Sequence, residues 1–327
     1  SEPELSPEDR KTRLSMFSSA LKCLNNWAMA YTHAGRHRED EPIFRFCLAQ
    51  QEEAFGGAHP ASFITRTNLA VIYRRQRRFR TAEPLFVQAL EDAEMLLGKE
   101  HPKTLGAAAN LADNYRQQRR FSEATPLFEF VLDARIRTLG DEHPDSIQSA
   151  HDLALLHLDQ GRLEEAEPLF QRARDGWIRT LGEAHPTTLI AIDNLARLYT
   201  NKSRLKEAEA LFLHVVECRT RLLGSEDVHT LVSTCNLAWL QVDMNHPKDG
   251  AVNFTHCVQA WANPMDWKHH WSRLGLALCD ALETRDFDAA EGVVGDLVSL
   301  LGEDHDRVTK SREKMDGVRR QLEAGDG

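Results

Sequence analysis

The sequence has little that would mark an enzyme, a secreted protein or a membrane protein. None of its six cysteines belongs to a Cys-x-x-Cys pair, which excludes the common zinc and dithiol motifs. No stretch approaches the ~18 consecutive apolar residues of a membrane-spanning helix. The polar N-terminal stretch SEPELSPEDRKTRLSMF has no apolar signal-peptide core. We therefore expect a cytoplasmic protein with free, mostly buried thiols and no contact with a membrane.

Positive charge is also in short supply. Lys and Arg together number 40 against 50 Asp and Glu, which gives a net charge of −10. Binding to nucleic acid needs a basic face that displaces counterions from phosphates, so we expect no nucleic-acid partner. The arginine-rich stretch YRRQRRFR at 73–80 falls at a turn of the repeat described below. A solvated turn is therefore the better interpretation of it.

What the sequence does contain is a long repeat. The stretch LGEAHPTTL at 181–189 has similar copies at 55–63, 97–105 and 139–147, and successive copies begin 42 residues apart. A degenerate copy, LGSEDVHTL, begins at 223, again 42 residues on. A feature that recurs at a fixed period belongs to the architecture of a chain before it belongs to an active site.

Each repeat unit predicts two helices. In the unit from 60 to 98, apolar residues follow helical spacing on both sides of a polar break at 76–78. Glycine is typical of a helix end and proline of a first helical turn, so Gly182 closes one helix and Pro186 opens the next. His185 then lies at or near the helix cap. The histidines of the four copies come from different repeats, too far apart to share a zinc ion.

Three further columns follow the same period. Phenylalanine recurs without a miss at 44, 86, 128, 170, 212 and 254. Alanine recurs at 82, 124, 166 and 208, where a small side chain lets two helices approach closely. The tripeptide Asn-Leu-Ala recurs at 68–70, 110–112, 194–196 and 236–238. These columns predict the shared core of a stack of helix pairs.

The columns resemble the tetratricopeptide repeat, and the 42-residue period with LGxxHPxTL linkers is similar to the repeats of kinesin light chains. The resemblance implies an all-α, right-handed superhelical solenoid of antiparallel helix pairs. Six regular pairs are expected to start near residues 17, 60, 102, 144, 186 and 228. We expect a flexible segment at 1–16, the six pairs at 17–262, a divergent seventh pair at 263–303, and a capping helix with a tail at 304–327.

The resemblance also implies a function, because the first helices of such pairs line a concave groove that holds a peptide or partner segment. Positions are carried over from the Asn-Leu-Ala anchor. The residues expected to bind a peptide are Lys22, Asn26, Asn68, Arg74, Arg75, Asn110, Arg116, His151, Asp152, Asp193, Asn194, Arg197, Asn236 and Trp239. We therefore expect a protein–protein interaction scaffold or adaptor.

Charge is not evenly spread over these positions. The basic residues fall in the first three pairs and the acidic ones in the last three, with Asp113 and Arg197 as exceptions. A basic half would suit peptides of the kind that kinesin light chains take, in which acids flank a tryptophan, since arginine binds carboxylates with two hydrogen bonds. The acidic half departs from that class. The alternative is a solvated face without a ligand, where Asp193 and Arg197 form an i, i+4 pair.

Other functions stay open at this stage. A sensor or regulatory module would bind a small ligand in the groove. An enzyme would use a groove-located site around His151 and Asp193, with the histidine as general base, although the sequence has no nucleophile elbow, phosphate loop or metal-ligand spacing. No catalytic residue, metal or cofactor is expected. The stretch 261–275 holds three tryptophans and is a candidate homodimer surface, but packing of an irregular junction is the preferred interpretation.

Overall fold

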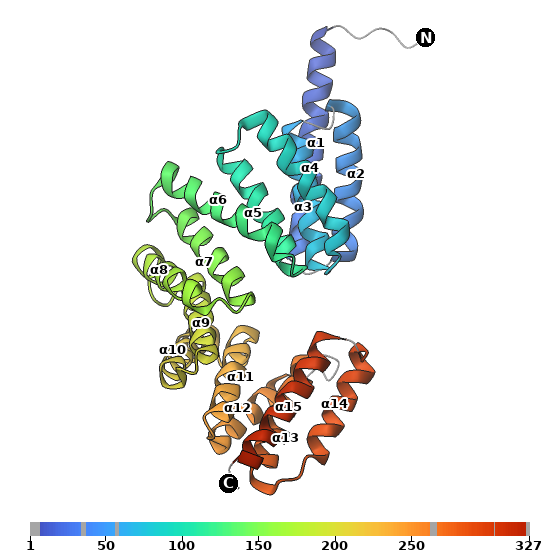
Figure 1. Ribbon diagram of the computed structural model, residues 1–327. Coiled ribbons are helices and arrows are strands. Elements are labelled where there is room, and N and C mark those ends of the chain that lie inside the picture. The colour runs from blue at the N-terminus through green and yellow to red at the C-terminus, as the bar shows by residue number, and fades with distance from the viewer. Residues whose placement is uncertain (1–6, 34–36, 56–58, 262–266, 304, 325–327) are drawn as a thin grey trace. The chain divides into compact units, whose positions relative to one another are not determined.

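The computed structural model describes residues 7–33, 37–55, 59–261, 267–303 and 305–324. Over these residues it contains fifteen α-helices and no β-strand, which confirms the all-α prediction (Figure 1). In chain order the helices are α1 (Pro7–His33), α2 (His37–Phe55), α3 (Pro60–Arg75), α4 (Phe79–Leu97), α5 (Pro102–Gln117), α6 (Phe121–Leu139), α7 (Pro144–Asp159), α8 (Leu163–Leu181), α9 (Pro186–Asn201), α10 (Leu205–Leu223), α11 (Val228–Asp243), α12 (Pro247–Ala260), α13 (Trp267–Thr284), α14 (Asp288–Leu301) and α15 (Asp306–Ala324).

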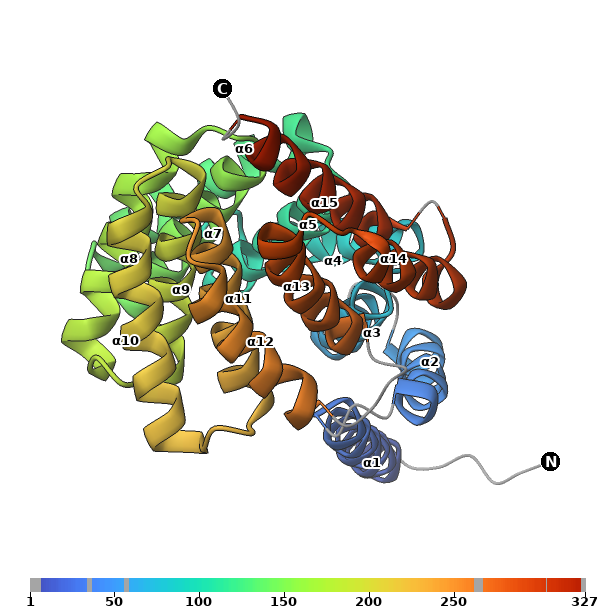
Figure 2. The ribbon, with the colours of Figure 1, turned by 90° about the horizontal axis from the view of Figure 1, so that it is seen from below.

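The helices divide into two compact units, residues 1–169 and 170–327, and the boundary falls inside α8. In the first unit, each helix from α1 to α7 packs against the next one in the chain. The same holds from α9 to α15 in the second unit, where α13 lies between α12 and α14 (Figure 2) and α15 contacts both α13 and α14. Neighbours in sequence are neighbours in space, as expected of a solenoid.

The recurring His-Pro motif marks the start of a helix. In His59, His101, His143 and His185, the imidazole Nδ1 accepts a hydrogen bond from the backbone N–H two residues on, at 3.1–3.2 Å. Asp227 of the degenerate copy does the same with its carboxylate, at 2.8 Å. The glycine at the second position of each of the later copies ends the preceding helix with φ of 86–92°, a conformation that other residues rarely adopt. The structural interpretation of the motif is confirmed.

The cap can be tested at α7. His143→Ala should reduce the free energy of unfolding by about 1 kcal/mol, because the first turn loses its side-chain acceptor. His143→Asp should keep the cap, since Asp227 already caps α11 in this way and negative charge suits a helix N-terminus. Urea denaturation followed by circular dichroism measures both variants. An Asp variant as unstable as the Ala variant would contradict the capping role.

The predicted columns form the core. The six phenylalanines spaced by 42 residues are at most 2% exposed, and the four alanines of the small-residue column are fully buried. Burial of one such aromatic side chain stabilises the fold by roughly 1.5–3 kcal/mol. Each phenylalanine belongs to the second helix of a pair. The core therefore consists of the same buried contacts repeated in each helix pair. The predictions for the phenylalanine column and the alanine column are confirmed.

The turn arginines are part of the same framework. The guanidinium groups of Arg78, Arg120 and Arg204 lie 4.3, 4.5 and 4.0 Å from the ring centroids of the tyrosines five residues earlier. Arg78 and Arg120 also form ion pairs with Glu41 and Glu83, at 3.0 and 2.7 Å. Stacking on an aromatic face and pairing with a carboxylate both hold these cations at the turns. Their contacts thus support a structural role for the arginine-rich stretches.

Both ends of the array depart from the regular pattern. α1 begins at Pro7, whereas the first pair was expected to start near residue 17. Proline suits a first helical turn and the residues at 8–11 are charged and compatible with a helix, so the segment expected to be flexible contains helical turns. At the other end, α12 and α14 have 14 residues each, while α4, α6, α8 and α10 have 19.

The tryptophans at 261–275 pack inward where they are described. Trp261 is buried, and the ring centroid of half-buried Trp271 lies 4.8 Å from that of Trp239. The side chain of Trp267 lies outside the described residues. The two described side chains favour the packed-junction interpretation, and a homodimer through this stretch stays a prediction.

The six cysteines are free thiols, of which Cys23 is exposed and the other five are buried. Burial raises the pKa of Cys235 and of Cys279 to about 12, so both stay protonated at neutral pH. Buried thiols of this kind act as small apolar side chains. Separately, none of the described helices is long and apolar enough to cross a membrane.

Candidate functional site

In the first unit, several predicted groove residues form a chain of ion pairs. Arg74 Nη1 lies 2.6 Å from Asp113 Oδ2, and Arg116 Nη2 lies 2.7 Å from Asp113 Oδ1. Arg116 Nη1 lies 2.5 Å from Asp159 Oδ2. Arg74 also donates to the side-chain oxygen of Asn110 at 3.4 Å. The residues come from α3, α5 and α7, so this ion-pair chain crosses the first helices of three successive pairs.

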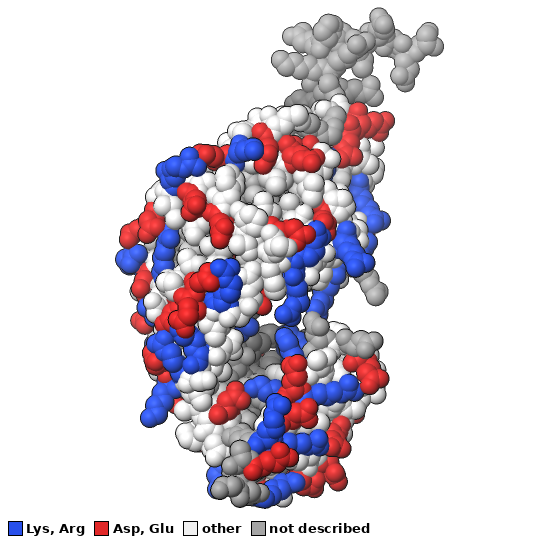
Figure 3. All heavy atoms as spheres, in the orientation of Figure 1, with Lys and Arg blue, Asp and Glu red and all other residues white. Residues whose placement is uncertain are grey.

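The ion-pair chain changes what the first unit offers to a ligand. The sequence predicts a basic half-groove, but Arg74 and Arg116 are already paired with carboxylates. Burial lowers the pKa of Arg74, and the negative charge of Asp113 opposes this shift. The ion pair between the two side chains is therefore partly desolvated. On the face shown in Figure 3, basic and acidic atoms are interspersed over this unit. Less unpaired positive charge is available there than the residue types suggest.

The remaining polar residues predicted for the first three pairs lie outside this ion-pair chain. Lys22, Asn26 and Arg75 are exposed, and Asn68 is half-buried. Exposed side chains of this kind are accessible to a partner, but exposure alone does not distinguish a binding surface from a solvated one. Their role in peptide binding stays a prediction.

His151 is the residue that the sequence offers as a general base. It is buried, and its Nδ1 lies 3.8 Å from Asp152 Oδ1, too far for a good hydrogen bond. Gln148 donates to the same oxygen of Asp152 at 2.8 Å. His151 and Asp193 belong to different units, and their pairing in an enzyme site stays a prediction. Among the described residues, no group of three or more His, Cys, Asp or Glu side chains could hold a metal ion.

In the second unit, four of the predicted residues line one open cavity of about 480 Å³. Asp193 and Arg197 come from α9, and Asn236 and Trp239 come from α11. Asn194 is buried, and its Oδ1 accepts a hydrogen bond from Arg197 Nη1 at 3.0 Å. The consensus asparagine thus positions the arginine, and the cavity has the volume of a ligand pocket.

Asp193 is held in this cavity by weak hydrogen bonds. Asn236 Nδ2 donates to one carboxylate oxygen at 3.4 Å, and Ser233 Oγ donates to the other at 3.5 Å. Burial raises the pKa of Asp193, and the positive charges of Arg219 and Arg197 oppose this shift. Asp193 is half-buried, and a partly desolvated carboxylate with long hydrogen bonds would be stabilised further by a donor that a ligand supplies.

The C-terminal helix α15 completes the cavity. Arg307, Lys310 and Lys314 share one helical face and line it. Lys314 Nζ pairs with Asp243 at 3.0 Å and lies 5.2 Å from the ring centroid of Trp239. Among the described residues, Lys310 has no carboxylate partner. The sequence interpretation of this helix as an end cap missed these cations, although their spacing along RVTKSREK was visible in the sequence.

Aromatic surface lies beside these charges. The ring centroid of Trp239 lies 5.1 Å from that of Phe254 and 4.8 Å from that of Trp271, so the three rings form one cluster. Trp239 is only 6% exposed, whereas Trp271 is half-buried and also lines the cavity. Trp271 therefore offers most of the aromatic surface that a ligand could reach.

Comparison with known families agrees with the fold. A family model described as a tetratricopeptide repeat matches four overlapping stretches, residues 20–95, 67–135, 104–178 and 150–212. Together these matches cover more than half of the chain. No curated protein matches the sequence significantly.

Solved structures share the architecture. A Podosopora anserina protein with nearly identical TPR-like repeats, described as a candidate kinesin light chain, is 27% identical with a TM-score of 0.54, over 63% of this chain and 97% of that one. BtubC (BKLC) from P. vanneervenii is 20% identical with a TM-score of 0.54, over 74% and 92% of the two chains. The apo quorum sensor NprR from B. thuringiensis is 13% identical with a TM-score of 0.63, over 91% and 82%. The predicted similarity to kinesin-light-chain-like repeats is confirmed.

Proposed function

Because the chain belongs to the tetratricopeptide repeat family, whose arrays generally mediate protein–protein interactions, we propose that it is an adaptor that holds a peptide segment of a partner protein. The proposed peptide site is the cavity lined mainly by α9, α11 and α15. The observation that carries this proposal is the meeting of Asp193, Arg197, Asn236 and Trp239 with the cation of Lys310 around one cavity.

The lining of the cavity suits a peptide with an acidic side chain next to a bulky apolar one. Lys310 and Arg197 supply positive charge for a carboxylate, and Trp271 supplies apolar surface. Asn236 uses its N–H group on Asp193, so its Oδ1 remains to accept a backbone N–H of the peptide. This is the class of peptide that the sequence suggests for the first three pairs, assigned now to the second unit.

Peptide binding tests the proposal directly. The probe is a library of acidic, tryptophan-containing peptides, measured by fluorescence anisotropy at two salt concentrations. Lys310→Glu should weaken binding by about tenfold or more, because it replaces attraction with repulsion, and high salt should weaken binding to the wild type. Arg320→Glu makes the same charge change on the same helix outside the cavity lining, and it should leave Kd nearly unchanged.

Each other outcome has a definite meaning. Equal binding by the wild type and the Lys310→Glu variant would refute a site at α15. If binding disappears only in a variant with Arg74→Glu and Arg116→Glu, the peptide site belongs to the first unit. If the folded protein binds no peptide of the library, the acidic-peptide proposal is wrong.

A sensor that binds a small ligand is the second candidate. A cavity of about 480 Å³ falls within the range of pockets that enclose small molecules. A series of peptides of increasing length separates the two functions. Affinity that stops rising beyond one or two residues would favour a small ligand, and affinity that grows with length would favour a peptide segment.

A further inference from the structure

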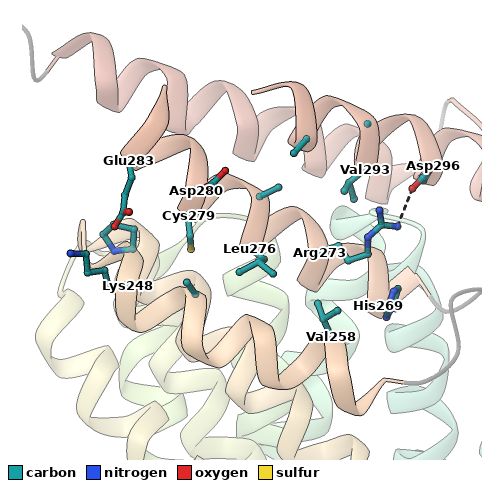
Figure 4. A pocket seen from close by; sticks show the side chains of 15 residues that line it. Lys248, Val258, His269, Arg273, Leu276, Cys279, Asp280, Glu283, Val293 and Asp296 are labelled. Atoms are coloured by element: carbon teal, nitrogen blue, oxygen red, sulfur yellow. Dashed lines mark hydrogen bonds and ion pairs between the residues drawn. The ribbon is translucent and has the colours of Figure 1, made fainter. Parts of the chain in front are cut away.

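A larger cavity, of about 1000 Å³, lies between α12, α13 and α14 (Figure 4). Its floor is apolar and consists of Ala251 and Val258 from α12, Leu276 and Ala277 from α13, and Val293 from α14. It shares no lining residue with the proposed peptide site. The two cavities therefore offer separate binding surfaces on the second unit.

The irregular seventh pair accounts for this cavity. α13 has 18 residues, but its neighbours α12 and α14 have only 14 each, so the walls are shorter than the helix between them. The lining residues Ala251 of α12 and Ala289 and Gly292 of α14 are also small. A Cβ atom added at Gly292 would meet no other atom within 4 Å. The space beside Gly292 is therefore open.

The charged rim differs between the two ends of the cavity. Asp280 and Glu283 stand at one end, and Lys248 lies across from Glu283 (Figure 4). Both carboxylates are exposed, and neither forms an ion pair among the described residues. At the other end, Arg273 is paired with Asp296 at 3.0 Å. The first end thus keeps an excess of negative charge, which attracts a cation.

The dimensions of the cavity match those of a helix. Its lining residues on α13 run from His269 to Glu283. At ~1.5 Å per residue this stretch is about 21 Å long, or about four helical turns. Helices that dock in an apolar groove present side chains at i, i+3, i+4 and i+7. An apolar stripe with that spacing would cover the floor from end to end.

We propose that this cavity is the docking groove for an amphipathic helix of a partner protein. The apolar stripe of that helix packs on Leu276, Ala277 and Val293, and a lysine or arginine of the helix lies over Asp280 and Glu283. The proposal goes beyond the peptide site, because it assigns a second and independent partner surface. Two such surfaces on one unit would let an adaptor join two proteins.

The probes are two phage-displayed libraries of helix-patterned peptides of about four turns, panned against the full chain. One library carries Lys and Arg beside the apolar stripe, and the other carries Glu. Clones from the basic library should be enriched. Gly292→Leu should fill the groove and weaken their binding by about tenfold or more, which titration calorimetry measures. Asp280→Lys combined with Glu283→Lys should weaken the same clones.

Gly295→Leu is the matched control. Gly295 lies on the same helix, has equally open space around it and does not line the cavity. Both leucine variants replace a helical glycine with a better helix former, so neither should unfold α14. Clones that bind Gly292→Leu as tightly as wild type, or no enriched clone on the folded chain, would overturn the proposal. A dimer in sedimentation that Gly292→Leu dissociates would assign the groove to a second copy instead.

Discussion

Arg66→Ala should lower the free energy of unfolding by about 3–5 kcal/mol, which is the usual cost of removing one partner of a buried ion pair. Arg66 and Asp92 are both buried, and their side chains form a close ion pair between α3 and α4. Without the arginine, the Asp92 carboxylate keeps a hydrogen bond from Gln88 at 3.1 Å. A single neutral donor does not replace a buried guanidinium.

The next repeat shows how the same site is filled without charge. The positions 42 residues on are Ala108 and Ala134, and both are buried. Arg66→Ala combined with Asp92→Ala reproduces that arrangement, so the double variant should recover much of the stability that the single variant loses. It should not recover all of it, because removing two large side chains leaves a cavity. A double-mutant cycle in urea measures the coupling energy.

An exposed ion pair supplies the control. Arg137 Nη2 lies 2.7 Å from Glu100, with both side chains largely in solvent. Arg137→Ala should cost less than ~1 kcal/mol, although the distance is ordinary for an ion pair. If Arg66→Ala costs no more than Arg137→Ala, or if the two losses at Arg66 and Asp92 simply add, then the buried pair is not coupled and the expectation is wrong.

Contacts that repeat with the period could be predicted from the sequence, and contacts made once could not. The phenylalanine column and the His-Pro caps recur every 42 residues, so each copy supports the assignment of the others. The pair of Arg66 with Asp92 occurs in one repeat, where the next has two alanines. The sequence does not reveal this ion pair, because helical spacing alone does not show which charged side chains of α3 and α4 meet.

The candidate site was predictable only in part, for a similar reason. Four residues selected from the Asn-Leu-Ala anchor, Asp193, Arg197, Asn236 and Trp239, line one cavity between α9 and α11, and their role in binding stays a prediction. The number of charged residues in each helix pair did not predict how much unpaired charge its surface offers. Arg74 forms an ion pair with Asp113 of the following helix pair, 39 residues away. The cations of α15 come from outside the period. Their place against α11 depends on how the irregular seventh pair packs, which no repeat column encodes.

Phe44→Ala should destabilise the N-terminal pair by about 3–5 kcal/mol, the usual cost of truncating a buried phenylalanine. Phe44 is fully buried in a cluster that includes Ala28, Leu48 and Leu69. Each pair of a repeat array contacts only its neighbours, so the loss should be concentrated in α1 and α2 and fade along the chain. Amide hydrogen exchange resolved by mass spectrometry should show α1 and α2 exchanging about a hundredfold or more faster, while α14 changes little.

Phe46→Ala is the matched control on the same helix. Phe46 is 54% exposed and lies two residues from Phe44, so its truncation removes little buried surface and should change stability by roughly 0.5 kcal/mol or less. Equal losses of protection in α2 and α14 with Phe44→Ala would mean that the two units unfold as one cooperative body. Equal effects of the two phenylalanine variants would mean that the 42-residue column does not carry the core. A loss confined to α1 and α2 in the Phe44 variant alone would establish that each column residue stabilises its own helix pair.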